Sequence, residues 1–299
     1  MKKLNQLSKK GWQFVALTIL LSSIPYYFII SDGDTSSNWT MFLMWMPALA
    51  GIIMRLSYKE GLFKGMSWNP IKHFKWILIA AFVPLCIDIA SIILTVFMGA
   101  GELKADFITI VEGQITLRGV AMILGASAQP WYVLVPNFLL SYFIGALLYS
   151  LTFALGEEYG WRGYLQKEWA SSNSELFGFV AIGAIWGWWH LPSILLGHNY
   201  PDYPILGGFI LMPILTFLFS IVFGFAFNKT RVIWIPVVFH GALNISSEIS
   251  NAGLIEESIN KPINDFIWTS LWAAAAFVFW RKYRASNNPD SINESLVIT

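Results

Sequence analysis

Residues 76–98 read WILIAAFVPLCIDIASIILTVFM, an apolar run in which Asp88 is the only charged side chain. A helix needs about 20 mostly apolar residues to cross a lipid bilayer. Runs of similar length and composition recur along the chain, so we predict eight membrane spans. They cover residues 12–30, 39–56, 76–98, 134–156, 176–196, 205–227, 232–249 and 265–280.

The composition agrees with a membrane protein and excludes several other classes. Of the 299 residues, 56% are hydrophobic and 12% are charged, whereas about a quarter of a soluble domain is charged. A net charge of +1 leaves no basic surface for nucleic acid. Because Cys86 is the only cysteine, a disulfide framework and a cysteine-based metal cluster are also excluded.

The Lys and Arg residues predict the orientation in the membrane. With eight spans both termini lie on one side, and that side carries all but Lys104, Arg118 and Lys261 of the 19 Lys and Arg residues. Cytoplasmic loops are enriched in Lys and Arg. The predicted fold is therefore an all-α polytopic membrane protein with about eight transmembrane helices and both termini cytoplasmic.

Ionisable or strongly polar groups inside these spans are the informative residues, because each costs several kcal/mol in lipid unless it is paired or functional. Four places hold them: Asp88, the run from Gly156 to Arg162, His190, and His240 with Asn244. Asp88 could be a proton site or catalytic, and a structural partner for another helix is our default interpretation.

The run Gly156-Glu157-Glu158-Tyr159-Gly160-Trp161-Arg162 closes the fourth apolar segment. Glu158 and Arg162 are four residues apart on a helix, in the order that favours an ion pair. Glu157 lies about 100° further round the helix and has no local cation, so its carboxylate is a candidate for chemistry. If the helix continues to about Lys167, Glu157 lies roughly 15 Å inside it. An ordinary charged cap at the membrane interface is an equally good interpretation of this run alone.

His190 follows Gly183 and Gly187, a spacing that lets another helix approach closely. Taken alone, His190 is more simply a hydrogen-bonding partner of a neighbouring helix. His240 and Asn244 share a helix face four residues apart. This pair could bind a metal, donate hydrogen bonds to a developing oxyanion, or hold helices together.

Three short motifs, each in its own span and in this order, resemble the CPBP family. They are Glu157-Glu158-x-x-x-Arg162, Trp186-x-x-x-His190 and His240-x-x-x-Asn244. The family comprises CAAX proteases and bacteriocin-processing enzymes and is also called the Abi family of intramembrane proteases. The family usually has Phe where this chain has Trp186, and we expect little consequence of that difference beyond local packing.

The resemblance implies endoproteolysis within the membrane. It implies that Glu157 activates a water together with His190, and that His240 and Asn244 stabilise the oxyanion. Glu158 with Arg162 would hold the geometry. The resemblance covers about residues 130–250, and the predicted organisation is one integral membrane unit in three parts: 1–130 (helices 1–3 and an external loop), 131–250 (the catalytic core) and 251–299 (the last helix and a cytoplasmic tail).

The use of a metal is left open by the sequence. Glu157, His190 and His240 could supply three ligands to zinc with a water as the fourth, and the family is commonly labelled metalloprotease. No HExxH motif is present, however, and one Glu cannot easily serve as both ligand and base. We favour the metal-free chemistry and keep zinc as the alternative.

Two other functions are considered. One is a non-proteolytic immunity or scaffold protein that has kept the fold. The other is a transporter that uses Glu157 and Asp88, although the inverted repeats typical of transporters are not evident. The expected partners are membrane lipids and a protein or peptide substrate, either a prenylated C-terminus or a leader peptide. The expected location is a bacterial cell membrane.

Overall fold

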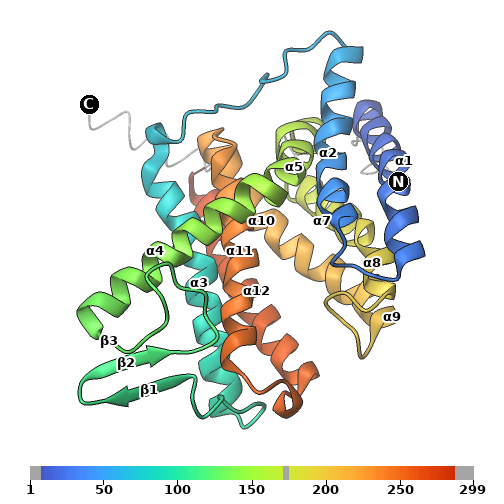
Figure 1. Cartoon of the computed structure of the whole chain (residues 1–299). Helices are drawn as coiled ribbons and strands as arrows, with labels where there is room; N and C mark the ends of the chain where they lie inside the picture. Colours follow the sequence, from blue (N-terminus) through green and yellow to red (C-terminus); the bar gives the residue numbers. More distant parts are fainter. Residues whose placement is uncertain (1–7, 171–174, 287–299) are drawn as a thin grey trace, which may run out of the picture. The chain divides into compact units, whose positions relative to one another are not determined.

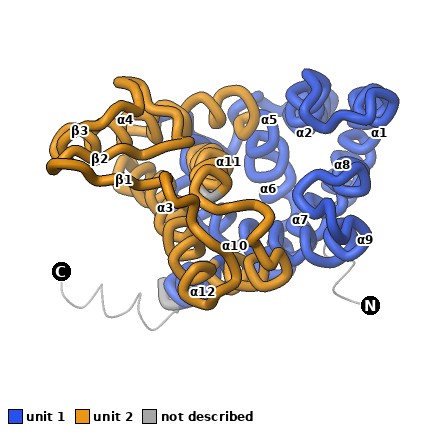
Figure 2. The backbone as a smooth tube through the Cα atoms, turned by 60° about the horizontal axis from the view of Figure 1, so that its bottom comes forward, with its two compact units in different colours: residues 1–69, 156–236, 272–299 blue, residues 70–155, 237–271 orange. Residues whose placement is uncertain are grey.

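The structure is a computed structural model, and it describes residues 8–170 and 175–286. It is mostly helical (Figure 1). The chain divides into two compact units that are interleaved in sequence (Figure 2). Unit 1 comprises residues 1–69, 156–236 and 272–299, and unit 2 comprises residues 70–155 and 237–271.

Unit 1 is built around two pairs of packed helices, α1 with α2 and α7 with α10. Ser8 caps the start of α1 by accepting a hydrogen bond from the Gly11 amide, and Gly33 ends the helix in a left-handed conformation (φ 65°), as is common at helix C-termini. The elements of unit 1 are α1 (Lys9–Asp32), α2 (Asn38–Ser57), α5 (Leu155–Glu158), η4 (Tyr159–Leu165), α6 (Gln166–Trp169), α7 (Glu175–Trp189), α8 (Leu191–Leu195), α9 (Pro204–Leu206), η5 (Gly207–Leu211) and α10 (Met212–Thr230).

Unit 2 holds helices and a small sheet. Its elements are η2 (Ile71–His73), α3 (Phe74–Phe97), β1 (Ile108–Val111), β2 (Gln114–Leu117), β3 (Gln129–Pro130), α4 (Trp131–Tyr149), η3 (Ser150–Ala154), α11 (Trp234–Gly253), η6 (Glu256–Ser258) and α12 (Lys261–Ser286). The first residues of α11 and the last part of α12 belong to unit 1.

Among the described residues, five helical segments are long and apolar enough to cross a membrane. They are Lys9–Asp32, Asn38–Ser57, Ile71–Phe97, Trp131–Trp169 and Pro204–Thr230, and they coincide with five of the predicted spans. The chain therefore has the helices of an integral membrane protein.

The other three predicted spans, 176–196, 232–249 and 265–280, also coincide with helices. Within the described ranges these helices are not among the five candidate spans. Helix α7 is apolar but short, with 15 residues, because Pro192 follows so closely and interrupts the helix. The count of eight spans and the cytoplasmic termini stay predictions, as does the division at residues 130 and 250. Residues 287–299 of the predicted tail lie outside the described residues.

The prediction of an all-α fold was wrong in one place. The loop predicted to be external forms a three-stranded antiparallel sheet in the order β1-β2-β3, beside the start of α4 in Figure 1. β1 and β2 are rich in β-branched residues, which favour strands. Between them, Glu112 and Gly113 both have positive φ, 50° and 76°, as a tight hairpin turn requires.

Glycines allow the closest helix contacts in unit 1. A Cβ at Gly183 or Gly187 of α7 would collide with the backbone of α10. The close approach predicted from this glycine pair is thus confirmed. Gly156 and Gly160 act in the same way against the backbone of α2 around Pro47, so two glycine pairs place α7 and the Glu157 helix at short range from their neighbours.

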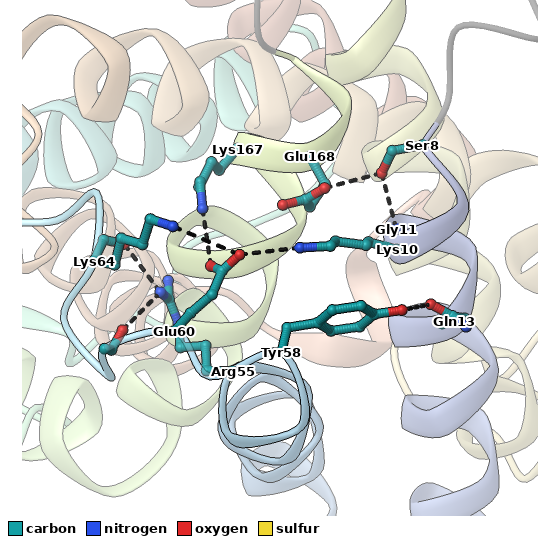
Figure 3. Close-up of polar contacts among 11 residues, drawn as sticks. Ser8, Lys10, Gly11, Gln13, Arg55, Tyr58, Glu60, Lys64, Lys167 and Glu168 are labelled. Atoms are coloured by element: carbon teal, nitrogen blue, oxygen red, sulfur yellow. Dashed lines mark hydrogen bonds and ion pairs between the residues drawn. The ribbon is translucent and has the colours of Figure 1, made fainter.

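A charged cluster joins three segments of unit 1 at one end of the helices (Figure 3). Glu60, in the loop after α2, accepts hydrogen bonds from Lys10 of α1 at 3.1 Å and from Lys167 of α6 at 3.0 Å. Lys64 lies 3.7 Å from the same carboxylate. Burial disfavours the charged form of Glu60, but the bonds from Lys167 and Lys10 outweigh it and lower its pKa to about 2. The cluster ties α6 to the N-terminal helices.

Candidate active site

The predicted carboxylates lie in a helical segment that runs without interruption from Trp131 to Trp169. The prediction that the helix continues past residue 156 to about Lys167 is therefore confirmed. Two π-helical stretches, η3 and η4, lie on either side of the short α5 that carries Glu157 and Glu158. Such wide turns recur at functional sites because they change the direction of the side chains that follow.

The Glu157 side chain is completely buried, and its Oε2 accepts hydrogen bonds from two indoles. Nε1 of Trp186 lies 2.6 Å away and Nε1 of Trp161 lies 3.3 Å away. Trp161 is four residues further along the same helix, whereas Trp186 comes from α7. A buried carboxylate is costly unless donors surround it, and the indoles supply N–H groups without adding charge.

Glu158 and Arg162 form the predicted ion pair, with Nη1 of Arg162 at 3.0 Å from Oε1 of Glu158. Both side chains are fully buried. The Arg162 guanidinium also lies 4.4 Å from the ring centroid of Trp186 and 5.2 Å from that of Phe223, and it donates to the Ser220 hydroxyl. This part of the prediction is confirmed.

His190 lies at the turn where α7 ends and α8 begins. Its Nδ1 is 2.8 Å from the carbonyl oxygen of Trp186, while its amide donates to the carbonyl of Gly187. Because a carbonyl oxygen only accepts, Nδ1 carries the hydrogen of this bond. In the neutral imidazole the other nitrogen, Nε2, then has the lone pair that a base needs.

Helix α1 also holds the turn between α7 and α8 that carries His190. The Tyr26 hydroxyl donates to the carbonyl oxygen of Trp189, and Nε1 of Trp189 donates to the Ser22 hydroxyl at 2.8 Å. Trp189 also packs edge-on against Trp161, with ring centroids 5.9 Å apart. The residue before His190 is therefore held by α1 and by the Glu157 helix together.

His240 and Asn244 lie in unit 2, on a regular turn of α11. His240 is buried, with 6% of its surface exposed, and its helix is fixed against α4 and η3. A Cβ at Gly241 would collide with Ser150, whose hydroxyl donates to the carbonyl of Val237. The helical spacing puts both predicted oxyanion donors on one face of α11.

Asp88 lies elsewhere in unit 2. Its Oδ1 accepts a hydrogen bond of 2.7 Å from Nε1 of Trp268 in α12, and the side chain is 3% exposed. The default interpretation, a structural partner for another helix, agrees with this contact. About two turns further along α3, Thr95 donates to Asn264 of the same α12 at 2.9 Å, so two polar contacts join α3 to α12.

A comparison with protein families supports the family resemblance that the motifs suggested. Residues 138–246 match the family described as type II CAAX prenyl endopeptidase, Rce1-like. The chain carries an Rce1-like CAAX prenyl endopeptidase domain. No curated protein matches the chain in a sequence comparison.

The Rce1-like domain contains the six predicted site residues and leaves α1, α2, α3 and α12 outside it. Unit 1 brings together four of the six, Glu157, Glu158, Arg162 and His190, around Trp186. His240 and Asn244 belong to unit 2, and their part in the site stays a prediction.

A metal ion bound by Glu157, His190 and His240 is the alternative that the sequence left open. The parts of the chain that the structure describes contain no group of three or more His, Cys, Asp and Glu side chains that could hold a metal ion. Oε2 of Glu157 accepts hydrogen bonds from Trp161 and Trp186, and carboxylates that bind metals also accept such bonds.

Sequence reasoning missed the indole contacts. Trp186 was expected to have little consequence beyond local packing, but its N–H also donates a hydrogen bond to Glu157. A signal was present at Trp161, which is four residues from Glu157 and so on the same helix face. No local signal marks Tyr26, because it is more than a hundred residues from Glu157 and His190 in the chain.

Proposed function

We propose that this protein is an intramembrane endopeptidase that hydrolyses a peptide bond near a lipidated or membrane-embedded segment of its substrate. The observation that carries the proposal is the buried carboxylate of Glu157. It is held by two indoles beside the fully buried Glu158–Arg162 pair, within a domain that matches CAAX prenyl endopeptidases.

In the proposed reaction, Glu157 and His190 act as the general base. They take a proton from a water molecule as its oxygen attacks the carbonyl carbon of the scissile bond. A base in apolar surroundings suits this step, because charge development there is not screened by solvent. When the tetrahedral intermediate collapses, the same groups return the proton to the leaving amine.

The carbonyl oxygen becomes negatively charged in the intermediate and needs hydrogen-bond donors. We assign this role to His240 and Asn244, as the resemblance implies. Glu158 and Arg162 do not react in this scheme. Their pair holds the helix turn that carries Glu157. Removing one partner would leave an uncompensated buried charge and destabilise that turn.

The substrate is a protein or peptide with a prenylated C-terminus, or alternatively a leader peptide. The enzyme works within a bacterial cell membrane, with both termini in the cytoplasm and eight spanning helices. These finer points rest on the resemblance and on the distribution of Lys and Arg.

The test is cleavage of a farnesylated CAAX peptide by the purified protein in detergent, followed by mass spectrometry. Wild type is compared with Glu157→Gln and with the matched control Glu257→Gln, which changes an exposed carboxylate in η6. We expect cleavage by wild type and by the control, and none by Glu157→Gln.

Equal cleavage by Glu157→Gln contradicts the proposed base. If wild type cleaves no prenylated peptide, membrane peptides from cells that produce wild type or Glu157→Gln are compared. Peptides that differ between the two point to another substrate, and identical sets favour an immunity or scaffold protein.

A further inference from the structure

Trp186 contacts both residues that the proposed reaction uses as its base. Its indole Nε1–H donates to Oε2 of Glu157 at 2.6 Å. Its main-chain carbonyl accepts a hydrogen bond from Nδ1 of His190 at 2.8 Å. One residue of α7 therefore fixes one oxygen of the carboxylate and one nitrogen of the imidazole.

The carbonyl contact follows from the end of the helix. In a continuing helix the amide of His190 would bond the Trp186 carbonyl, but here it bonds Gly187, three residues back. Carbonyls at a helix C-terminus need other partners, and the imidazole supplies one. The interruption near Pro192 thus sets the orientation of His190.

The indole itself is rigidly packed. Trp186 is 2% exposed and lies among the Arg162 guanidinium and the rings of Phe219 and Phe223, with centroid distances of 4.4, 6.1 and 6.3 Å. Its helix is pressed against the backbone of α10 at Gly183 and Gly187. A donor with so little freedom orients its acceptor.

We propose that Trp186 is a positioning residue for the reaction, whose indole N–H orients the Glu157 carboxylate while its carbonyl orients the His190 imidazole. This inference rests on the proposed function. It is specific to chains with Trp at this position, because a Phe ring has no donor to offer the carboxylate. Trp161 acts in the same direction through its longer bond of 3.3 Å.

The test is Trp186→Phe, which keeps an aromatic ring in the pocket and removes the N–H. The matched control is Trp188→Phe on the same helix, because the Trp188 indole is half exposed and bonds the Phe209 carbonyl. We expect kcat for peptide cleavage to fall about tenfold with Trp186→Phe, the equivalent of about 1.4 kcal/mol. KM should stay within twofold of wild type, and Trp188→Phe should keep both parameters.

An infrared difference spectrum supplies a readout that does not depend on activity. Subtracting Glu157→Gln from wild type assigns the carboxylate band of Glu157. Trp186→Phe should shift that band, whereas Trp188→Phe should leave it in place. A change confined to the thermal midpoint or to KM is the result of a merely structural role and overturns the inference.

The inference and the proposed function fail in different ways. An active wild type whose kcat and carboxylate band are both unchanged in Trp186→Phe overturns the inference alone. A wild type that cleaves nothing overturns the proposed function, and the role of Trp186 in catalysis with it.

Discussion

The guanidinium of Arg162 lies over the ring of Trp186, 4.4 Å from its centroid. The same guanidinium donates to Glu158, and the indole that it covers donates to Glu157. The ion pair and the proposed base are therefore joined through one aromatic ring. Removing the Arg162 charge therefore changes the surroundings of both carboxylates.

The buried pair leads to a prediction about stability. Glu158→Met or Arg162→Met alone should lower the free energy of unfolding by about 3–5 kcal/mol, because each leaves an uncompensated buried charge. The double variant should lose less than either single one, since it removes both charges. Denaturant unfolding in detergent micelles measures all four proteins, and a double variant that loses the sum of both single losses would contradict the prediction.

The Glu60 cluster makes stability depend on pH. The pKa of Glu60 is lowered to about 2 in the folded chain from 4.5, so its contribution is complete above pH 4.5 and is lost as the pH falls towards 2. Glu60→Gln should cost about 1–2 kcal/mol at pH 7, within the range of hydrogen bonds to charged groups and exposed ion pairs. Thermal unfolding of both proteins across this range should show the difference shrinking on acidification, and a constant difference would argue against the cluster.

The close packing of α7 on α10 can be tested with one methyl group. Gly187→Ala places a Cβ against the backbone of Pro213, and overpacking of this kind costs about 1–3 kcal/mol. Gly61→Ala is the control, because a Cβ there meets no atom within 4 Å. Thermal midpoints in detergent should fall for Gly187→Ala only.

The Tyr26 contact predicts a role for α1, which lies outside the matched domain. Tyr26→Phe removes the hydrogen bond to the Trp189 carbonyl and should cost about 1 kcal/mol of stability. It should also lower peptide cleavage, since Trp189 precedes His190. Tyr27→Phe changes an exposed neighbour, 67% of whose surface is accessible, and should behave like wild type. Equal stability and cleavage in both variants would remove α1 from the site.

Metal removal distinguishes the two mechanisms that the motifs allow. Because one Glu cannot easily serve as both a metal ligand and the base, we expect cleavage to persist after dialysis against a zinc chelator. Loss of cleavage that added zinc restores would favour a metal held by Glu157, His190 and His240.

Contacts within one helix could be predicted from the sequence. The Glu158–Arg162 pair follows from a spacing of four residues, and the same periodicity places Trp161 beside Glu157. The apolar runs predicted the helices for the same reason, because length and hydropathy are local properties. Local signals also indicate the hairpin at residues 108–117, namely the β-branched residues and the Glu112–Gly113 turn. This stretch was nevertheless predicted as a loop.

Contacts between helices were decided by the tertiary structure. The bond between Trp186 and Glu157 joins residues 29 positions apart, and the bond between Tyr26 and Trp189 joins residues 163 positions apart. Neither separation follows the helical repeat, because such contacts depend on how closely two helices pack and on how each helix is rotated about its axis. A glycine pair shows that a close approach is allowed, but only packing selects the partner helix and the side chains that meet there.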